Sequence, residues 1–162
     1  PNLATRYKAW TALQKMGNAA VPELEKLWRS NADPRMRARA LWALSKMPEG
    51  KKYIAEAIKD NNPNIRITGL RAARQVGSDV LAHVAQLAHD ANPQVLRECA
   101  IALRHNKTPE AAKLWADVAM QYKSGDRWLL EALGIGADKQ WDKFLDAYLQ
   151  QNSNPMQTAE GK

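Results

Sequence analysis

The segment Asp33-Pro34-Arg35-Met36-Arg37 decides the fold of this 162-residue chain, because versions of it recur along the sequence. Asn62-Pro63-Asn64-Ile65-Arg66 and Asn92-Pro93-Gln94-Val95 repeat its order of a polar residue, a proline and, two positions further, an apolar residue. The three prolines lie 29 and 30 residues apart. Asp and Asn side chains accept hydrogen bonds from the free amides of a helix's first turn, and proline fits the first helical position. The pattern therefore predicts helices that begin at residues 34, 63 and 93.

A period of about thirty residues with a helix start in each repeat is typical of an α-solenoid, whose units bury their apolar faces only by stacking. Ala12-Leu13 and Ala132-Leu133 match Ala43-Leu44 and extend the pattern in both directions. An amphipathic second helix follows each first helix, and no segment has the alternation of a strand. The sequence predicts an all-α fold, an α-α superhelix (HEAT-like solenoid) of about five helical hairpins over residues 1–151. Residues 152–162 have too few apolar residues to offset their ordering entropy, so we expect a disordered tail.

Each first helix carries an apolar stripe with small residues in one column, and we expect this stripe to face the core. The stripes are Ala9, Ala12, Leu13 and Met16; Met36, Ala40, Ala43, Leu44 and Met47; Ile65, Gly69, Ala72, Ala73 and Val76; Val95, Cys99, Ala102 and Leu103; and Leu129, Ala132 and Leu133. Cys99 shares the small-residue column with Ala40 and Gly69. We therefore interpret this single cysteine as a packed core residue and not as a nucleophile.

The six tryptophans fall into two groups. Four lie on or beside the stripes and are expected to fill space between helices: Trp10, Trp28, Trp115 and Trp141. Trp42 and Trp128 lie off the stripe, at two helix positions whose counterparts in neighbouring repeats are Arg71 and Glu98 respectively. Such an aromatic residue either packs on a flanking helix or anchors a partner.

The fifth hairpin contains more apolar bulk than one helical interface requires, namely Trp128, Leu130, Trp141, Phe144 and Tyr148. A terminal repeat normally has a polar outer face. We therefore predict a partner-binding surface that includes Trp128 with Asp126 and Arg127 at its rim, and Trp42 as a further candidate. The alternative is that the hairpin's own two helices, together with Tyr122, cover this apolar surface.

No pattern of catalytic residues stands out. A single cysteine excludes an internal disulfide and any Cys-x-x-Cys metal site or Cys-x-x-Cys-His haem site within these residues. The spacing of His83 and His89 places them on different helix faces, so we expect them, with His105, to be solvated or to cap helices. Gly134-Ile135-Gly136 is interpreted as a helix end where glycine tolerates left-handed backbone. We therefore predict no catalytic residue, no cofactor site and no metal site in this segment.

Charge is concentrated in the first helices. The formal charge of the chain is +7, whereas the five first helices together carry +10 and ten of the eleven arginines. A candidate basic patch consists of Arg35, Arg39, Arg71 and Arg74, and a stripe of this kind could follow a phosphate backbone. The alternative is that the charge maintains solubility and that arginines such as Arg37 and Arg66 tie adjacent turns through carbonyl groups. We favour the alternative and do not expect a nucleic-acid partner.

Two further features of the sequence concern membrane insertion and the extent of the chain. No run of eighteen apolar residues exists, so we predict no membrane span. The chain begins with Pro1 and not with Met, which suggests a segment of a longer protein.

Residues 1 to about 151 resemble HEAT-type repeats, on the basis of Asp33-Pro34-Arg35-Met36-Arg37 with Ala40 and Ala43-Leu44. More specifically, residues 65–74, 97–104, 125–137 and Trp141-Asp142 resemble the HEAT segment of large exported bacterial proteins similar to membrane-bound dehydrogenases, a haem-binding family of the planctomycete and verrucomicrobial type. In that family a β-propeller precedes the solenoid and a c-type cytochrome domain follows it.

The resemblance implies a non-catalytic scaffold or spacer segment in a larger exported redox protein, located in the periplasm or outside the cell. Its partners would be adjacent domains of the parent chain or another protein, and any oxidoreductase activity would belong to the propeller. Two alternatives stay open. One is a nucleic-acid-binding protein similar to HEAT-like DNA glycosylases, which would use the arginine-rich layer. The other is a relative of HEAT-like bilin lyases with an apolar ligand groove.

Overall fold

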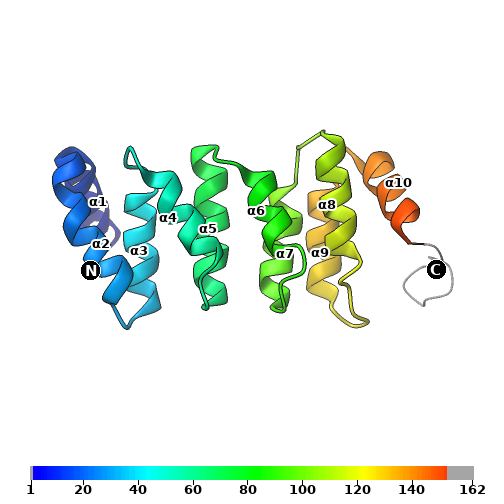
Figure 1. Ribbon diagram of the computed structural model, residues 1–162, viewed down its shortest axis with the longest axis horizontal. Coiled ribbons are helices and arrows are strands. Elements are labelled where there is room, and N and C mark those ends of the chain that lie inside the picture. The colour runs from blue at the N-terminus through cyan, green and yellow to red at the C-terminus, as the bar shows by residue number, and fades with distance from the viewer. Residues whose placement is uncertain (1, 153–162) are drawn as a thin grey trace. The chain divides into compact units, whose positions relative to one another are not determined.

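The computed structural model describes residues 2–152, and within this range it contains ten α-helices, one short 3₁₀-helix and no strand (Figure 1). The predicted all-α class, with helical hairpins that stack on one another, is therefore confirmed. The chain divides into two compact units, Pro1–Ser78 and Asp79–Lys162, which are described separately below. Of the predicted tail, Asn152 caps the end of the last helix, and residues 153–162 lie outside the described residues.

Unit 1 contains five α-helices and the 3₁₀-helix. They are α1 (Leu3–Met16), η1 (Gly17–Ala20), α2 (Val21–Ser30), α3 (Pro34–Leu44), α4 (Gly50–Ile58) and α5 (Pro63–Val76). Helix α3 packs against α1, α2, α4 and α5, and α4 also packs against α5. First helices thus contact one another in one layer, and second helices cover them from the other side.

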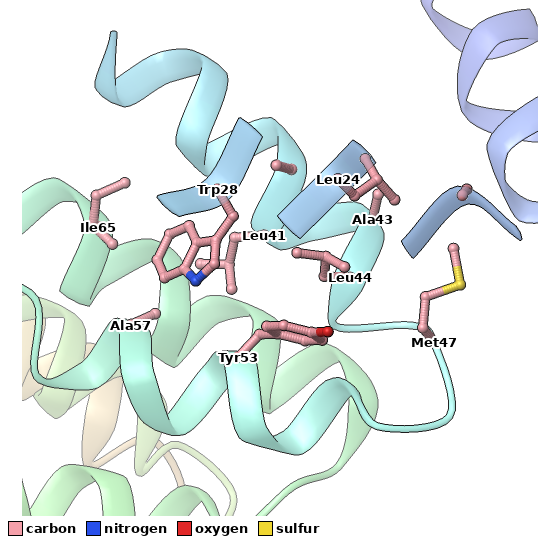
Figure 2. Packing of buried hydrophobic residues seen from close by; sticks show 11 residues of the cluster. Leu24, Trp28, Leu41, Ala43, Leu44, Met47, Tyr53, Ala57 and Ile65 are labelled. Carbon is pink, nitrogen blue, oxygen red and sulfur yellow. The ribbon is translucent and has the colours of Figure 1, made fainter. Parts of the chain in front are cut away.

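The core of unit 1 gathers apolar side chains from four helices (Figure 2). Trp28 of α2 and Tyr53 of α4 are buried beside Leu41 and Leu44 of α3. Each aromatic side chain has a polar partner at its edge, because Trp28 Nε1 donates to Glu56 Oε2 at 3.0 Å and Tyr53 Oη donates to Glu25 Oε1 at 2.6 Å. These two hydrogen bonds link α2 to α4 and satisfy the polar atoms that the aromatic rings bring into the core.

Unit 2 contains α6 (Val80–Leu87), α7 (Pro93–Ala102), α8 (Pro109–Ala119), α9 (Arg127–Gly136) and α10 (Trp141–Gln151). Helix α8 packs against α6, α7, α9 and α10, and α7 packs against α9. Trp115 of α8 lies at the centre of this arrangement, where its ring meets Phe144 at 5.5 Å between centroids and its Nε1 donates to the Leu133 carbonyl at 3.1 Å.

The three predicted helix starts are confirmed. Asp33, Asn62 and Asn92 accept from the backbone amides of Arg35, Asn64 and Gln94, at 2.8, 2.9 and 2.9 Å. Pro34, Pro63 and Pro93 are the first residues of α3, α5 and α7, as the lack of a proline amide donor favours. The prediction that Cys99 is buried is also confirmed, at 0% exposure.

The core prediction was wrong for the first helix. Helix α1 has no buried residue, and Ala9, Ala12 and Met16 of its predicted stripe are exposed. Trp10 is 38% exposed where we expected space-filling contact, although Lys46 Nζ lies 5.0 Å from its ring centroid. The physical reason is that among the described helices α1 packs on one side only, against η1 and α3.

Further corrections concern two residues at other helix ends. Val76 in the last turn of α5 is 39% exposed, so the stripe of that helix ends at Ala73. Trp141 is 51% exposed and meets Trp115 edge-on with 6.2 Å between ring centroids, so it covers the core without being buried in it.

His83 and Gly136 also differ from expectation. His83 is buried, with 7% exposure, and not solvated, and burial lowers its pKa below 6.5 although Asp79 opposes the shift. Helix α9 ends at Gly136, as the Gly134-Ile135-Gly136 segment predicted, but neither glycine has left-handed backbone. A Cβ at Gly136 would lie 2.3 Å from the Ala100 carbonyl oxygen, so this glycine permits the close approach of α9 to α7.

Candidate protein-binding surface

The beginning of α9 contains three predicted site residues, Asp126, Arg127 and Trp128. Asp126 caps the helix, because its Oδ1 accepts from the Leu129 amide at 3.0 Å and from Arg97 Nη2 at 2.8 Å. The cap and the ion pair fix the first turn of α9 on α7. Trp128 follows in that turn and is 66% exposed, which makes it the most exposed described tryptophan. A rigid helix start therefore holds a large aromatic side chain in solvent.

The outward face of α9 continues the apolar surface beyond Trp128. Leu130 and Ile135 are 50% and 44% exposed. Together with Gly134, Glu131, Arg104 and Asp138 they line an open groove of about 580 Å³. Arg104 Nη2 donates to Asp138 Oδ2 at 2.8 Å, and this bond lowers the pKa of Asp138. The groove thus has an apolar floor on α9 and a charged edge formed by the turn after α7 and the turn after α9.

Helix α10 presents a second apolar stripe. Trp141, Leu145 and Leu149 recur every four residues, so they lie along one face of the helix. They are 51%, 45% and 45% exposed, whereas Phe144, on the side that faces α8, is 1% exposed. Tyr148 is half-buried and its hydroxyl accepts from Asn152 Nδ2 at 2.9 Å. The sequence indicated the apolar excess of this hairpin, but it did not indicate the exposure of Ile135, Leu145 and Leu149.

Trp42, the remaining tryptophan candidate, lies in unit 1 on α3. It is half-buried, and its carbonyl accepts from Ser45 Oγ at 3.1 Å. Its side chain therefore offers less free surface than that of Trp128.

The four arginines of the candidate basic patch are all exposed and belong to two helices of unit 1. Arg35 and Arg39 lie one turn apart on α3, and Arg71 and Arg74 lie one turn apart on α5. Two further first-helix arginines, Arg37 and Arg66, hold adjacent segments together. Arg37 Nε donates to the Trp28 carbonyl at 3.0 Å and its guanidinium pairs with Asp60, while Arg66 Nη1 donates to the Asp60 carbonyl at 2.8 Å. The predicted role of Arg37 and Arg66 in tying turns through carbonyl groups is confirmed.

Within residues 2–152, no three His, Cys, Asp or Glu side chains converge in a way that could hold a metal ion. Burial raises the pKa of the Cys99 thiol far above its ordinary value, so the reactive thiolate form is suppressed. His89 is exposed and its Nδ1 lies 2.9 Å from Gln121 Nε2. His105, also exposed, adopts left-handed backbone after α7, with φ of 67°.

Comparison of the chain with protein-family models, with curated proteins and with solved structures finds no significant match. None of the helices in the described part of the chain is long and apolar enough to cross a membrane.

Proposed function

We propose that this chain is a non-catalytic scaffold solenoid that binds a protein neighbour through the outward faces of α9 and α10. The observation that supports the proposal is the set of large apolar side chains exposed on these two helices, which comprises Trp128, Leu130, Ile135, Trp141, Leu145 and Leu149. Aromatic residues held on rigid elements lose little side-chain entropy when a partner covers them, and tryptophan is among the commonest hot-spot residues.

The resemblance to HEAT-type repeats supports the same proposal, because such repeats stack through the outer faces of consecutive hairpins. In the parent protein that the resemblance implies, the neighbour is an adjacent domain, and the chain is a spacer segment of an exported redox protein. The neighbour's helix or strand would pack on Trp128 and on the Trp141, Leu145 and Leu149 stripe, with Arg127 at the polar rim.

The nucleic-acid alternative has less support. Three first-helix arginines, Arg37, Arg97 and Arg104, form ion pairs with Asp60, Asp126 and Asp138. A guanidinium already paired with a carboxylate gains less from a phosphate, because the existing pair must first separate. Binding of duplex DNA should therefore be weak and non-specific, with a dissociation constant of about 10⁻⁴ to 10⁻⁶ M at physiological salt.

Site-specific photocrosslinking tests the protein-binding proposal in the native organism or in the full parent chain. A photoreactive phenylalanine at position 128, and separately at position 145, should give a discrete crosslinked product. The same residue at Lys51, which is exposed on α4 of unit 1, is the control. Equal crosslinking at all three positions would contradict the proposal. A second comparison uses Trp128→Ala, which should reduce crosslinking from position 145 without changing helix content.

A further inference from the structure

A second surface of unit 2 has a different chemistry from the apolar faces of α9 and α10. Helices α8 and α10 border an open groove of about 540 Å³ whose lining includes Lys107, Lys113 and Lys143. An adjoining groove of about 430 Å³ shares Lys107 and Lys143 and adds Lys139 beside Trp141. Four lysines therefore surround one continuous depression that begins before α8 and follows the length of α10.

These lysines are available to a ligand. All four are exposed, and no ion pair among residues 2–152 involves any of them. This contrasts with the first-helix arginines, several of which pair with aspartates. The carboxylates in the two grooves, Asp142 and Asp146, offset only part of the local positive charge. Lysines around a concave surface produce a positive potential that attracts anionic partners.

The floor of the groove is apolar and its far end is rich in amides. Pro109, Ala112 and Ala147 form the floor, and Gln150 and Gln151 lie at the end. Gln151 Nε2 donates to the Lys113 carbonyl at 3.4 Å and so ties α10 to α8, while Gln150 is exposed. An amide side chain both donates and accepts, which suits the backbone of an extended peptide.

We infer that this lysine groove binds an acidic peptide segment of another protein, as a site additional to the apolar surface of α9 and α10. The groove's own carboxylates favour a ligand with spaced negative charges, because a polyanion with a charge at every unit would meet Asp142 and Asp146. A second copy of the chain is disfavoured by its formal charge of +7. The chain's own residues 153–162 contain one glutamate and one lysine, so they supply no net negative charge.

Fluorescence anisotropy with the whole chain tests this inference. The probe is a labelled twelve-residue peptide that alternates glutamate with alanine, and the comparison ligand is a labelled single-stranded DNA of equal charge. We expect the triple variant Lys107→Glu, Lys113→Glu, Lys143→Glu to weaken peptide binding by about tenfold or more, because each reversal removes an attraction and adds a repulsion. Raising the salt from about 0.05 M to about 0.5 M should also weaken binding, since the Debye length shortens.

The matched control is Lys8→Glu, Lys26→Glu, Lys51→Glu, which changes the net charge equally at exposed lysines of unit 1. It should alter the peptide affinity by less than about twofold if the groove is the site, because these lysines do not line the groove and exposed charges are screened by salt. Asp146→Asn should tighten peptide binding. An equal loss in both triple variants would overturn the inference, as would tighter binding of the DNA than of the peptide. Circular dichroism confirms that each variant keeps its helix content.

The outcome can be distinguished from that of the scaffold proposal, although Trp141 belongs to both surfaces. Trp128→Ala lies outside the lysine groove and should leave the affinity for the acidic peptide unchanged. Loss of peptide binding in the lysine variant, with crosslinking from position 128 retained, would separate the two surfaces.

Discussion

Helices α8 and α10 are both second helices of their hairpins and both contain eleven residues, yet they are buried to very different extents. Seven residues of α8 are buried, including Leu114, Trp115 and Val118. Only Phe144 of α10 is buried. Both helices carry a tryptophan and several large apolar residues. The difference arises because α8 packs against four other helices of unit 2, whereas the main packing partner of α10 is α8.

The comparison shows that an apolar stripe on a helix indicates a preference for burial and does not indicate which neighbour supplies it. The same holds for α1 in unit 1, which packs on one side only, against η1 and α3, and has no buried residue. In a stacked fold, coverage depends on position in the array and not on the composition of one helix.

The strongest test of the difference in burial between α8 and α10 is to replace one tryptophan in each helix by alanine. Trp115→Ala removes a side chain that is 5% exposed, and the Leu133 carbonyl then keeps only the Ala137 amide of its two donors. We expect a loss of about 3–5 kcal/mol in the free energy of unfolding. Trp141→Ala, at a 51% exposed side chain, should cost far less. Urea unfolding of both variants measures the difference, and equal losses would show that α10 is as well packed as α8.

A substitution at the contact between α7 and α9 should have the next largest effect on the free energy of unfolding. Gly136→Ala would place a methyl group 2.3 Å from the Ala100 carbonyl oxygen, so the helices must separate. We expect a cost of about 1–3 kcal/mol from overpacking. Gly134→Ala is the matched control, because its nearest atom would be 3.9 Å away, and it should stabilise α9 by about 0.5–1 kcal/mol. Equal melting temperatures for the two variants would contradict the close approach of α9 to α7.

The Asp126 cap of α9 should contribute somewhat less to the free energy of unfolding than the contact at Gly136. Asp126→Ala removes the side-chain acceptor of the Leu129 amide and the partner of Arg97, with an expected cost of about 0.5–2 kcal/mol. Asp126→Asn keeps the cap and removes the charge, so it should recover part of the loss. If urea unfolding gave the same stability for the alanine variant and the unmodified chain, the first turn of α9 would not depend on this cap.

His83 should have a smaller effect on stability, and this effect should appear only as the pH falls. The folded-state pKa of His83 is lowered below 6.5, so its unfolded form takes up a proton first as the pH falls. Stability is therefore fully present above about pH 6.5 and decreases as the pH falls toward the folded pKa. His83→Gln should reduce the pH dependence of the urea unfolding midpoint between about pH 7 and about pH 5.5. An unchanged slope in that interval would show that His83 is readily protonated in the folded state.

The smallest effect is expected on the outward stripe of α10. Leu145→Gln replaces a 45% exposed leucine, so the free energy of unfolding should change by no more than about 0.5 kcal/mol. The same variant should reduce crosslinking to the neighbour if the stripe binds it. A large destabilisation would indicate instead that Leu145 belongs to the core of unit 2.

Much of the fold follows from local sequence signals. Asp33, Asn62 and Asn92 each precede a proline, and this local chemistry was sufficient to locate three helix starts. Cys99 could be assigned to the core because its spacing places it in a column of small residues. Gly136 could not be interpreted correctly, because the carbonyl that a Cβ would meet belongs to Ala100 in another helix.

The candidate surfaces were only partly predictable for a related reason. The apolar excess of the fifth hairpin was visible in the sequence, and it correctly indicated the exposure of Trp128 and Leu130. The lysine groove was not visible, because Lys107, Lys113 and Lys143 lie in different segments, and the concentration of arginines in the first helices drew attention elsewhere.

The sequence by itself determined the helices, their boundaries at capped prolines, and the apolar stripe on each, since these depend on interactions over one or two turns. Only the tertiary structure decided which stripes are covered and which charges are paired. Arg97 and Asp126 lie 29 residues apart and meet because α9 packs on α7. Burial and ion pairing are properties of neighbours, and neighbours distant in sequence are selected by the packing of whole helices.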